Sequence, residues 1–573
     1  MRRVAVFTVL AAMSCGGSGA GDAAIPPAEC TEDCAPVVPD GACGVGTAPI
    51  PTSHACTPVG WTDACPDGFA PAASGWGCAP VMPADACSGA TKPVLGQTTC
   101  VPIGDCDAPF PPDGAIVVAG SIAAALASAP RGATIAIPPG TYVESLVVRH
   151  DVRIVGKCAR DVIVRSDGGA AAGLDAQGAV ASLEGVTLTG HLHGVSVGAA
   201  ADVLLRDVLV DGAREVGVAA DGAMLTLDGV VVRGTLAAAD GSLGRGLDIG
   251  DAKATIDGSA IESSVETGLL LRRGQVTLTR SIVAHTLGGT SGGGRGVYVS
   301  AGGTLDADRV AIVDSGEIGL YVTGAVTQAS VEESVMQATR PTDAGLFGRG
   351  VVVSAGAAVA LRKSAVRASH DAGVLVTDAS MTIDASVIDG VDASPAGAGA
   401  GLAAAGHATV NVTSSAFVSA SAVGLTADAS DVSLHGSAVL GTRPDAAGAL
   451  GVGALAKNGA RLVLERSAVD RARYAGVVAR DDGTELSLSH AWIGAVRAQA
   501  DGAFGHGLVA LAGARADART SVIRGCDRDG LFYSGARGVV DRGLVTENAV
   551  GAHAQDGSAI HASSDTVTPA ESG

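Results

Sequence analysis

One histidine and a pair of neighbouring acids are the residues of this chain whose types and spacing could carry out a reaction. His506 lies between two glycines in the stretch AFGHGLVA, and Asp481-Asp482 precedes it by a short distance. Hydrolysis of a glycosidic bond with inversion needs two carboxyl groups, one to protonate the leaving oxygen and one to activate water. Asp481, Asp482 and His506 are therefore the catalytic candidates.

The elements that would position these residues form a long repeat. A glycine followed by an apolar run recurs in steps that alternate between 22–23 and 28–31 residues. A period above 20 with short strands in each unit is typical of a solenoid. We expect about fifteen coils, stacked roughly 4.8 Å apart. The marker glycines are Gly194, Gly217, Gly246, Gly268, Gly296, Gly319, Gly350, Gly373, Gly401, Gly424, Gly453, Gly476, Gly507 and Gly530.

The start of the repeat carries a resemblance to a known fold. The stretch 121–129 predicts a short helix with Ser121 as its N-cap, and Pro138-Pro139-Gly140 then opens a strand. This order resembles the start of the right-handed parallel β-helices of the pectate-lyase-like superfamily. The resemblance implies an all-β solenoid over 111–564, and it makes a polysaccharide lyase or hydrolase one possible activity.

The same resemblance allows the catalytic candidates to be tested. Pectin hydrolases with a Gly-His-Gly strand also carry an Asn-Thr-Asp strand and an Arg-x-Lys one coil later, and this chain has neither. Aligned on the marker glycines, His506 falls in the column of Arg245, Arg295 and Arg349. We therefore interpret Gly-His-Gly as a variant of the repeat.

Metal and cofactor sites are weakly supported. Lyases of the superfamily bind calcium through several acids on neighbouring strands, whereas the loop acids of this chain stand at differing offsets. Loop aspartates are also ordinary turn residues. We expect no metal and no cofactor, with calcium the one alternative, at Asp240, Asp343, Asp392, Asp445 and Asp501.

Three further columns repeat with the coils. Opposite charges alternate, predicting a ladder of ion pairs worth ~0.2–1 kcal/mol each or, alternatively, a strip for an ionic polymer. A serine column predicts stacked hydroxyls, and every second coil carries an insertion that we expect on one binding face. The ladder is Glu215, Arg245, Glu266, Arg295, Glu317, Arg349 and Asp371. The serines are Ser259, Ser281, Ser334, Ser364, Ser386, Ser415, Ser437, Ser467 and Ser521. The insertions are 235–244, 286–294, 339–348, 391–399, 442–451 and 496–505.

Cysteines repeat every 22 residues before the solenoid. Short units rich in Pro and Gly cannot bury enough surface alone, so we expect disulfides formed in an oxidising compartment. Pairing within a repeat, such as Cys34 with Cys43, and pairing between neighbouring repeats are both open, and Cys30 with Cys158 is a further option. Cys526 is expected to be an inert buried thiol. The disulfide candidates are Cys30, Cys34, Cys43, Cys56, Cys65, Cys78, Cys87, Cys100, Cys106 and Cys158.

The first residues predict where in the cell the protein is located. Residues 1–15 resemble a bacterial lipoprotein signal in which Cys15 becomes the lipidated N-terminus. A flexible tether (16–29), the Cys-rich repeats (30–110), the solenoid (111–564) and a frayed tail (565–573) follow. We expect an outer-membrane lipoprotein of the bacterial envelope, facing the periplasm or the surface, or alternatively a secreted protein. The net charge of −20 excludes an extended nucleic-acid contact.

The sequence therefore leaves three hypotheses for function. The first is a non-catalytic envelope lipoprotein whose β-helix binds glycan or envelope components. The second is a polysaccharide lyase or hydrolase that uses Asp481, Asp482 and His506. The third is a purely structural spacer.

Overall fold

The computed structural model describes residues 36–166, 168, 171–289, 292–394, 399–562 and 566–567. The chain forms two compact units, which we call the central unit (Gly60–Ser421) and the terminal unit (Met1–Val59 with Ala422–Gly573). None of the helices within the described ranges is long and apolar enough to cross a membrane. Cys15, Cys30 and Cys34 lie outside the described residues, as does most of the predicted tail.

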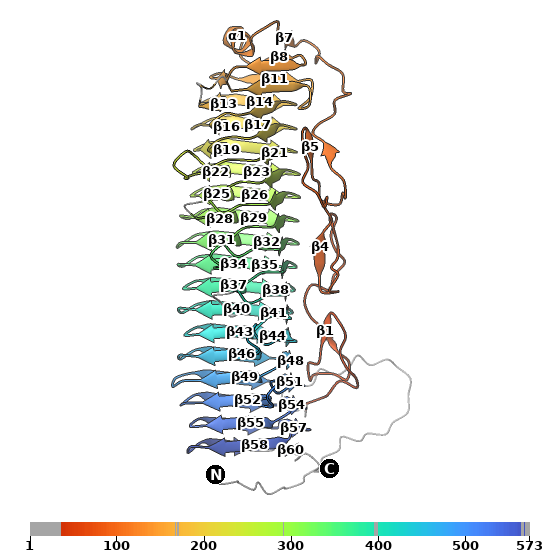
Figure 1. Ribbon diagram of the computed structural model, residues 1–573, viewed down its shortest axis with the longest axis vertical. Helices are drawn as coiled ribbons and strands as arrows, with labels where there is room; N and C mark the ends of the chain where they lie inside the picture. Colours follow the sequence, from red (N-terminus) through yellow and green to blue (C-terminus); the bar gives the residue numbers. More distant parts are fainter. Residues whose placement is uncertain are drawn as a thin grey trace, which may run out of the picture. The chain divides into compact units, whose positions relative to one another are not determined.

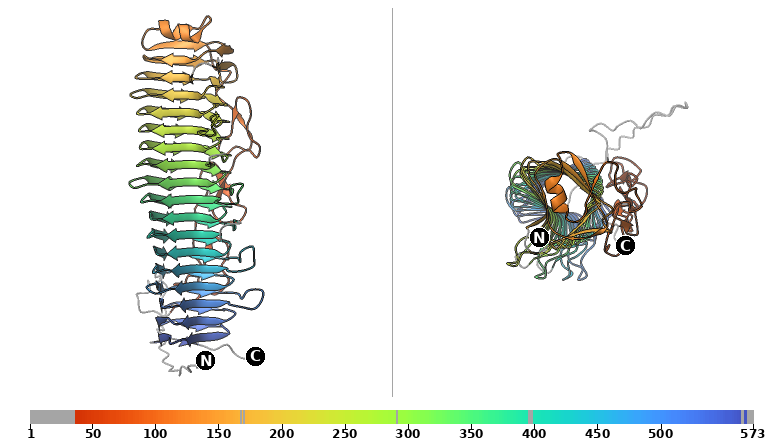
Figure 2. Two further views of the ribbon diagram at one scale, coloured as in Figure 1. Left: turned by 60° about the vertical axis from the view of Figure 1, so that its left-hand side comes forward. Right: turned by 90° about the horizontal axis from the view of Figure 1, so that it is seen from above.

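Each coil supplies one strand to each of three parallel sheets. The coil around Gly296 consists of β28 (Arg295–Ser300), β29 (Thr304–Asp308) and β30 (Ala311–Val313). These strands pair in parallel with β31 (Ile318–Thr323), β32 (Gln328–Glu332) and β33 (Val335–Gln337) of the next coil. Figure 1 shows the stacked strands of the coils, and Figure 2 shows them from the side and from above. The predicted parallel β-helix is confirmed.

The first sheet contains the strands that begin at the marker glycines. In the central unit it runs from β10 (Leu146–Val148) to β40 (Ala400–Ala405), and in the terminal unit from β43 (Val423–Asp428) to β58 (Val550–Gln555). Both units together supply 17 such strands, against about fifteen coils expected. Small aliphatic residues fill the interior, as Val297 and Val299 do on β28.

The marker glycines stack because nothing larger fits. A Cβ atom on Gly319 would lie 2.6 Å from the carbonyl oxygen of Gly350, the next marker along the chain. In the terminal unit a Cβ on Gly453 would lie 2.5 Å from the oxygen of Gly476. Such approaches exclude every side chain, so the periodic glycines read in the sequence fix the register of the coils.

The predicted serine ladder is also confirmed. Ser364 Oγ accepts a hydrogen bond from the amide of Ser334 at 3.1 Å, and the amide of Ser364 donates to Ser386 Oγ at 3.1 Å. Each hydroxyl also donates to the carbonyl two residues earlier, as Ser364 does to Arg362 at 2.8 Å. The column therefore satisfies buried backbone amides at one corner of successive coils.

A short helix starts the solenoid, as the sequence predicts. Helix α1 (Ile122–Ser128) has Ser121 as its N-cap, and Ser121 Oγ accepts from the amide of Ala124. The carboxylate of Glu144 accepts from the amides of Ile122 and Ala123 at 2.8 and 2.9 Å. Both groups satisfy amides of the first turn that have no partner inside the helix.

The disulfides join neighbouring repeats. Three of the bonds are Cys43–Cys56, Cys65–Cys78 and Cys87–Cys100, and each closes one antiparallel hairpin, such as β3 (Phe69–Pro71) with β4 (Cys78–Pro80). Pairing within a repeat is therefore wrong for these cysteines, because the hairpin lies between the two repeats. The fourth bond, Cys106–Cys158, rules out the suggested Cys30–Cys158 pair.

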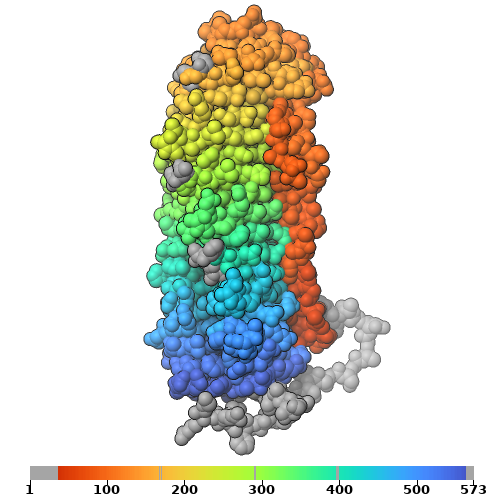
Figure 3. All heavy atoms as spheres, in the orientation of Figure 1, coloured from red at the N-terminus to blue at the C-terminus, as the bar shows by residue number. Residues whose placement is uncertain are grey.

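The Cys-rich segment from Gly60 onward packs against the coils of the central unit. Figure 3 shows it lying along the coils of the central unit. Lys92 Nζ donates to the carbonyl of Gly229 at 2.9 Å, and Arg367 Nη1 donates to the carbonyl of Cys78 at 3.1 Å. Because Cys78 precedes Lys92 whereas Arg367 follows Gly229, the segment runs opposite to the coils. It packs against the third strand of several coils of the central unit, where Ile103 lies in one apolar cluster with Leu209, Val231 and Ala260.

Candidate functional site

The structure does not bring the three catalytic candidates together. His506 is the first residue of β52 (His506–Leu511), whereas Asp481 and Asp482 lie in the turn after β49 (Ala475–Arg480). Ala475 pairs with His506 and Arg480 with Leu511, so the acids lie at the far end of the strand. At ~3.3 Å per residue this separation is about 17 Å, and Asp482 lies against Gly513. A shared hydrolytic centre does not form.

His506 instead faces a buried acid of the next coil. Its Nδ1 lies 2.9 Å from Oδ2 of Asp529, the first residue of β55 (Asp529–Ser534), at an angle too bent for a hydrogen bond. The side chains of His506 and Asp529 are 12% and 7% exposed. His553 Nδ1 approaches the same carboxylate oxygen at 3.8 Å. Two imidazoles therefore lie within ion-pair distance of one buried carboxylate.

Aromatic rings surround this pair on consecutive coils of the terminal unit. The rings of Tyr474 and Phe504 stack with centroids 3.9 Å apart, and Phe532 lies 5.0 Å from His506 and 5.3 Å from His553. We call Tyr474, Phe504, His506, Phe532 and His553 the aromatic row. Phe, Tyr and Trp make up only 3% of the chain, so three such rings with two imidazoles on neighbouring coils are a local concentration.

The aromatic row rests on a rigid apolar base. Val452, Val478 and Val509 are buried beneath it, with Tyr474 and Phe532 packed against them. Burial raises the pKa of Tyr474, which keeps its phenol protonated and able to donate. Phe504 is 39% exposed. The row therefore offers apolar ring surface beside hydrogen-bonding groups, a combination suited to a ligand with both apolar faces and hydroxyls.

Each arginine of the charge ladder pairs with an acid that follows it in the chain. Arg245 Nε lies 2.8 Å from Glu266 Oε2, and Arg349 Nε lies 2.5 Å from Asp371 Oδ2. Arg295 Nε lies 3.4 Å from Glu317 Oε2, whose pKa is raised by burial, while Glu215 Oε2 lies 3.4 Å from His193. Each arginine thus meets the acid of the following coil. His506 stands in the arginine column, but Asp529 lies one residue nearer to its marker glycine than Glu266, Glu317 and Asp371 do.

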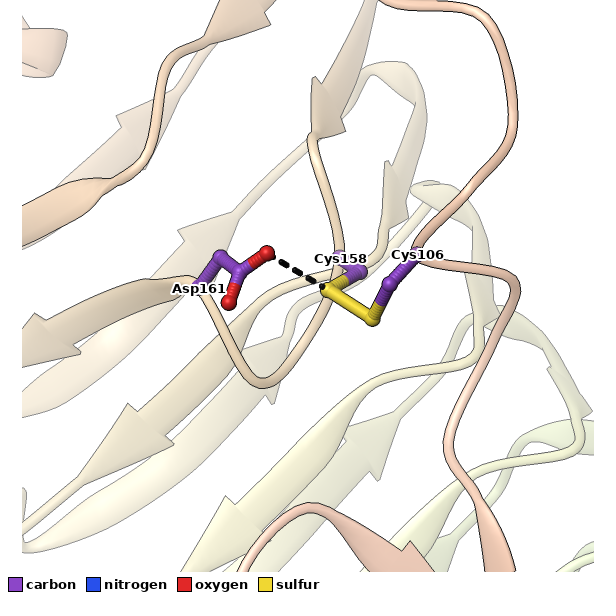
Figure 4. Close-up of side chains that lie close together, drawn as sticks. All are labelled: Cys106, Cys158 and Asp161. Carbon is purple, nitrogen blue, oxygen red and sulfur yellow. Dashed lines mark hydrogen bonds between the residues drawn. A yellow bond between two sulfur atoms is a disulfide. The ribbon is translucent and has the colours of Figure 1, made fainter.

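Two cysteine sites offer no chemistry of their own. Asp161 Oδ2 lies 3.4 Å from Cys158 Sγ, but Cys158 and Cys106 are joined in a disulfide and provide no thiolate for a metal ion (Figure 4). Cys526 is buried, which raises its pKa to about 12. Its thiolate is not available at neutral pH.

Comparisons with known proteins give distant likenesses. No protein-family model matches the chain, and no curated protein matches it. Among solved structures, it is similar to the A-module of the mannuronan C-5 epimerase AlgE6 of Azotobacter vinelandii, with 13% identity, 68% of this chain and 92% of that chain covered, and a TM-score of 0.26. The alginate lyase AlyGC of family PL6 shows 9% identity, coverages of 78% and 98%, and a TM-score of 0.21.

A third likeness is to the catalytic unit of a GH87 α-1,3-glucanase of Streptomyces thermodiastaticus. It shows 12% identity, coverages of 81% and 71%, and a TM-score of 0.26. The fold assignment rests on the strand register described above rather than on these scores.

Sequence reasoning missed the aromatic row. It aligned glycines, charges and serines on the coils but not the aromatic residues. Tyr474 stands two residues before marker Gly476, and Phe532 two residues after marker Gly530. Alignment of all rings on the marker glycines would have shown them on neighbouring coils.

Proposed function

We propose that this protein is a non-catalytic module that binds a polysaccharide along the aromatic row. The observation that carries the proposal is the succession of Tyr474, Phe504, Phe532 and His553 on neighbouring coils. Sugars present apolar C–H faces to rings and hydroxyls to polar groups, and the row supplies partners for both. An extended chain of sugars can contact several coils at once.

The absence of turnover is part of this proposal. Inverting hydrolysis needs two carboxyl groups near the scissile bond. Within the described part of the chain, the only carboxylate that pairs with His506 is Asp529, which is nearly buried. Asp481 and Asp482 lie too far along the strand to assist. A polysaccharide lyase or hydrolase is the second candidate, favoured by the distance of 2.9 Å between His506, a side chain that can act as a base, and the carboxylate of Asp529.

The disulfides indicate an oxidising compartment, which places the protein outside the cytoplasm, in the periplasm or extracellular space. We further propose that Cys15 is lipidated and anchors the chain to the outer membrane. Replacing Cys15 by Ala should then move the protein from the membrane fraction to the soluble fraction, and unchanged fractionation would contradict the anchor.

A glycan array followed by calorimetry tests binding. The wild type should bind at least one polysaccharide, and Phe532→Ala should weaken binding by about tenfold or more. Leu287→Ala, which removes an exposed leucine from a loop of the central unit, is the matched control and should bind normally. Unchanged affinity of Phe532→Ala would refute the site.

Assays for reducing ends and for unsaturated products on the same polysaccharides separate the two candidates. The proposal predicts no product. Product formation that disappears in His506→Ala would replace the binding module by the enzyme.

A further inference from the structure

Four of the long insertions end in the same loop. Their last seven residues read AADGSLG, TDAGLFG, DAAGALG and QADGAFG. In each loop the first amide donates to the fifth carbonyl, for example Thr342 to Leu346 at 2.9 Å and Gln499 to Ala503 at 2.9 Å. We call this the loop motif. Two copies lie in the central unit, at 238–244 and 342–348, and two in the terminal unit, at 445–451 and 499–505.

The sixth residue of every loop motif is bulky and held in a left-handed conformation. The φ angles are 62° at Leu243, 64° at Phe347, 60° at Leu450 and 63° at Phe504. A residue with a Cβ atom pays roughly 1–2 kcal/mol for this conformation. Such a conformation persists only where the surrounding structure holds it in place. Each loop therefore holds a large apolar group beside the first sheet.

One copy in each unit has a polar residue two positions after a phenylalanine, and this residue meets an acid of the next coil. In the terminal unit Phe504 is followed by His506, which meets Asp529 of the next coil at 2.9 Å. In the central unit Phe347 is followed by Arg349, which meets Asp371 of the next coil at 2.5 Å. The Arg349 guanidinium lies over the Phe347 ring at 4.9 Å from its centroid.

We propose that Phe347, Arg349 and Asp371 form a second polysaccharide-binding site, in the central unit. The inference rests on the function proposed for the aromatic row and extends it to a region with no part in that row. Phe347 would stack on a pyranose ring, and the guanidinium of Arg349 would donate to sugar hydroxyls. Asp371 fixes the guanidinium and compensates its charge, so an acidic sugar is not required.

The other two loops show that the backbone turn alone does not make the site. The loop of Leu243 has the ion pair Arg245–Glu266 but no ring, and the loop of Leu450 is followed by the apolar Val452. The shared backbone thus occurs without the complete set of side chains. Only the loops of Phe347 and Phe504 join an aromatic ring to an oriented polar group.

Titration calorimetry with a short oligosaccharide of the polysaccharide identified on the array tests the inference. The wild type should bind about two oligosaccharides per chain. Phe347→Ala and Phe504→Ala should each reduce this number to about one, and the double variant should not bind. Phe347→Tyr, which retains a ring, should bind as the wild type does, and Leu287→Ala should have no effect. Thermal unfolding followed by circular dichroism checks that each variant is folded.

The possible failures are distinguishable. A stoichiometry that Phe347→Ala leaves unchanged, while Phe504→Ala abolishes binding, would overturn the second site and leave the aromatic row intact. Loss in Phe347→Ala with no effect of Phe504→Ala would instead refute the aromatic row. A wild type that binds no saccharide would refute both.

Discussion

Substitutions in two columns of buried hydroxyls in the central unit should affect stability differently. Ser364 belongs to the ladder, where its Oγ accepts from the amide of Ser334 and donates to the carbonyl of Arg362. Thr286 belongs to a second column, in which the hydroxyls are buried without a hydrogen-bond partner. That column consists of Thr235, Ser264, Thr286, Ser315, Thr339 and Ser369.

The expected change in unfolding free energy depends on which buried polar groups each substitution leaves unpaired. Ser364→Ala leaves the buried amide of Ser334 without an acceptor, which costs about 1–3 kcal/mol of unfolding free energy. Thr286→Val keeps the shape of the side chain and removes a hydroxyl whose burial without a partner costs a similar ~1–3 kcal/mol. Thr286→Val should therefore leave stability unchanged or raise it, and the two variants should differ by at least about 1–3 kcal/mol.

Denaturation by guanidinium chloride, followed by circular dichroism, measures the difference. Repeat proteins can unfold in parts, so both substitutions are compared by the shift of the transition that involves the central unit. Ser364→Ala should move this midpoint to lower denaturant, and Thr286→Val should not.

A loss of stability in Thr286→Val as large as that in Ser364→Ala would refute the reasoning. It would mean that the second column is satisfied, with ordered water as the simplest partner. Ser281→Ala, a second member of the ladder that accepts from the amide of Ser259 at 3.1 Å, serves as a replicate of the first effect.

Three further outcomes follow from the fold. Gly319→Ala should lower the unfolding free energy by about 1–3 kcal/mol or more in denaturant titrations, because its Cβ would meet a carbonyl at 2.6 Å, whereas Gly120→Ala, with open space around it, should have little effect. Arg367→Met should destabilise by about 3–5 kcal/mol and expose the Cys-rich segment to proteases, because it leaves Asp389 buried without its cation at 2.7 Å; normal protease resistance would contradict this role. Cys526 should resist iodoacetamide at pH 8 until denaturant is added, which mass spectrometry can follow, because its pKa is about 12.

The sequence was sufficient for features that repeat with the coils. A glycine forced by a carbonyl at 2.5–2.9 Å, or a serine that satisfies the next amide, recurs because every coil has the same steric problem. The period of the repeat was therefore sufficient to predict the solenoid, its register and the hydroxyl ladder. The interior needed no long-range information, since each residue packs on its equivalents in the coils before and after it.

Features that depend on chain segments far apart in sequence were not predictable in the same way. The cysteine spacing allowed two pairings, and the hairpin between Cys65 and Cys78 decided for one of them. The packing of Arg367 on the Cys-rich segment joins residues nearly 300 positions apart, as in its bond to Ser74. No local pattern predicts such a contact. The cover by the Cys-rich segment does explain why the third strands keep apolar residues at positions such as Leu209, Val231 and Ala260, which are buried against Ile103.

The candidate site falls between these two cases. His506 was recognised, but its partner was sought among Asp481 and Asp482 because they are adjacent acids. In a parallel β-helix, however, a residue at the start of a strand meets residues at the start of the neighbouring strand rather than the turn at the far end of that strand. Asp529, the first residue of the next strand of the sheet, lies beside His506, and Asp371, directly before the next strand, lies beside Arg349. Chemistry on this fold should therefore be sought column by column, and the columns of Phe504 and Phe347 are where rings and oriented polar groups coincide.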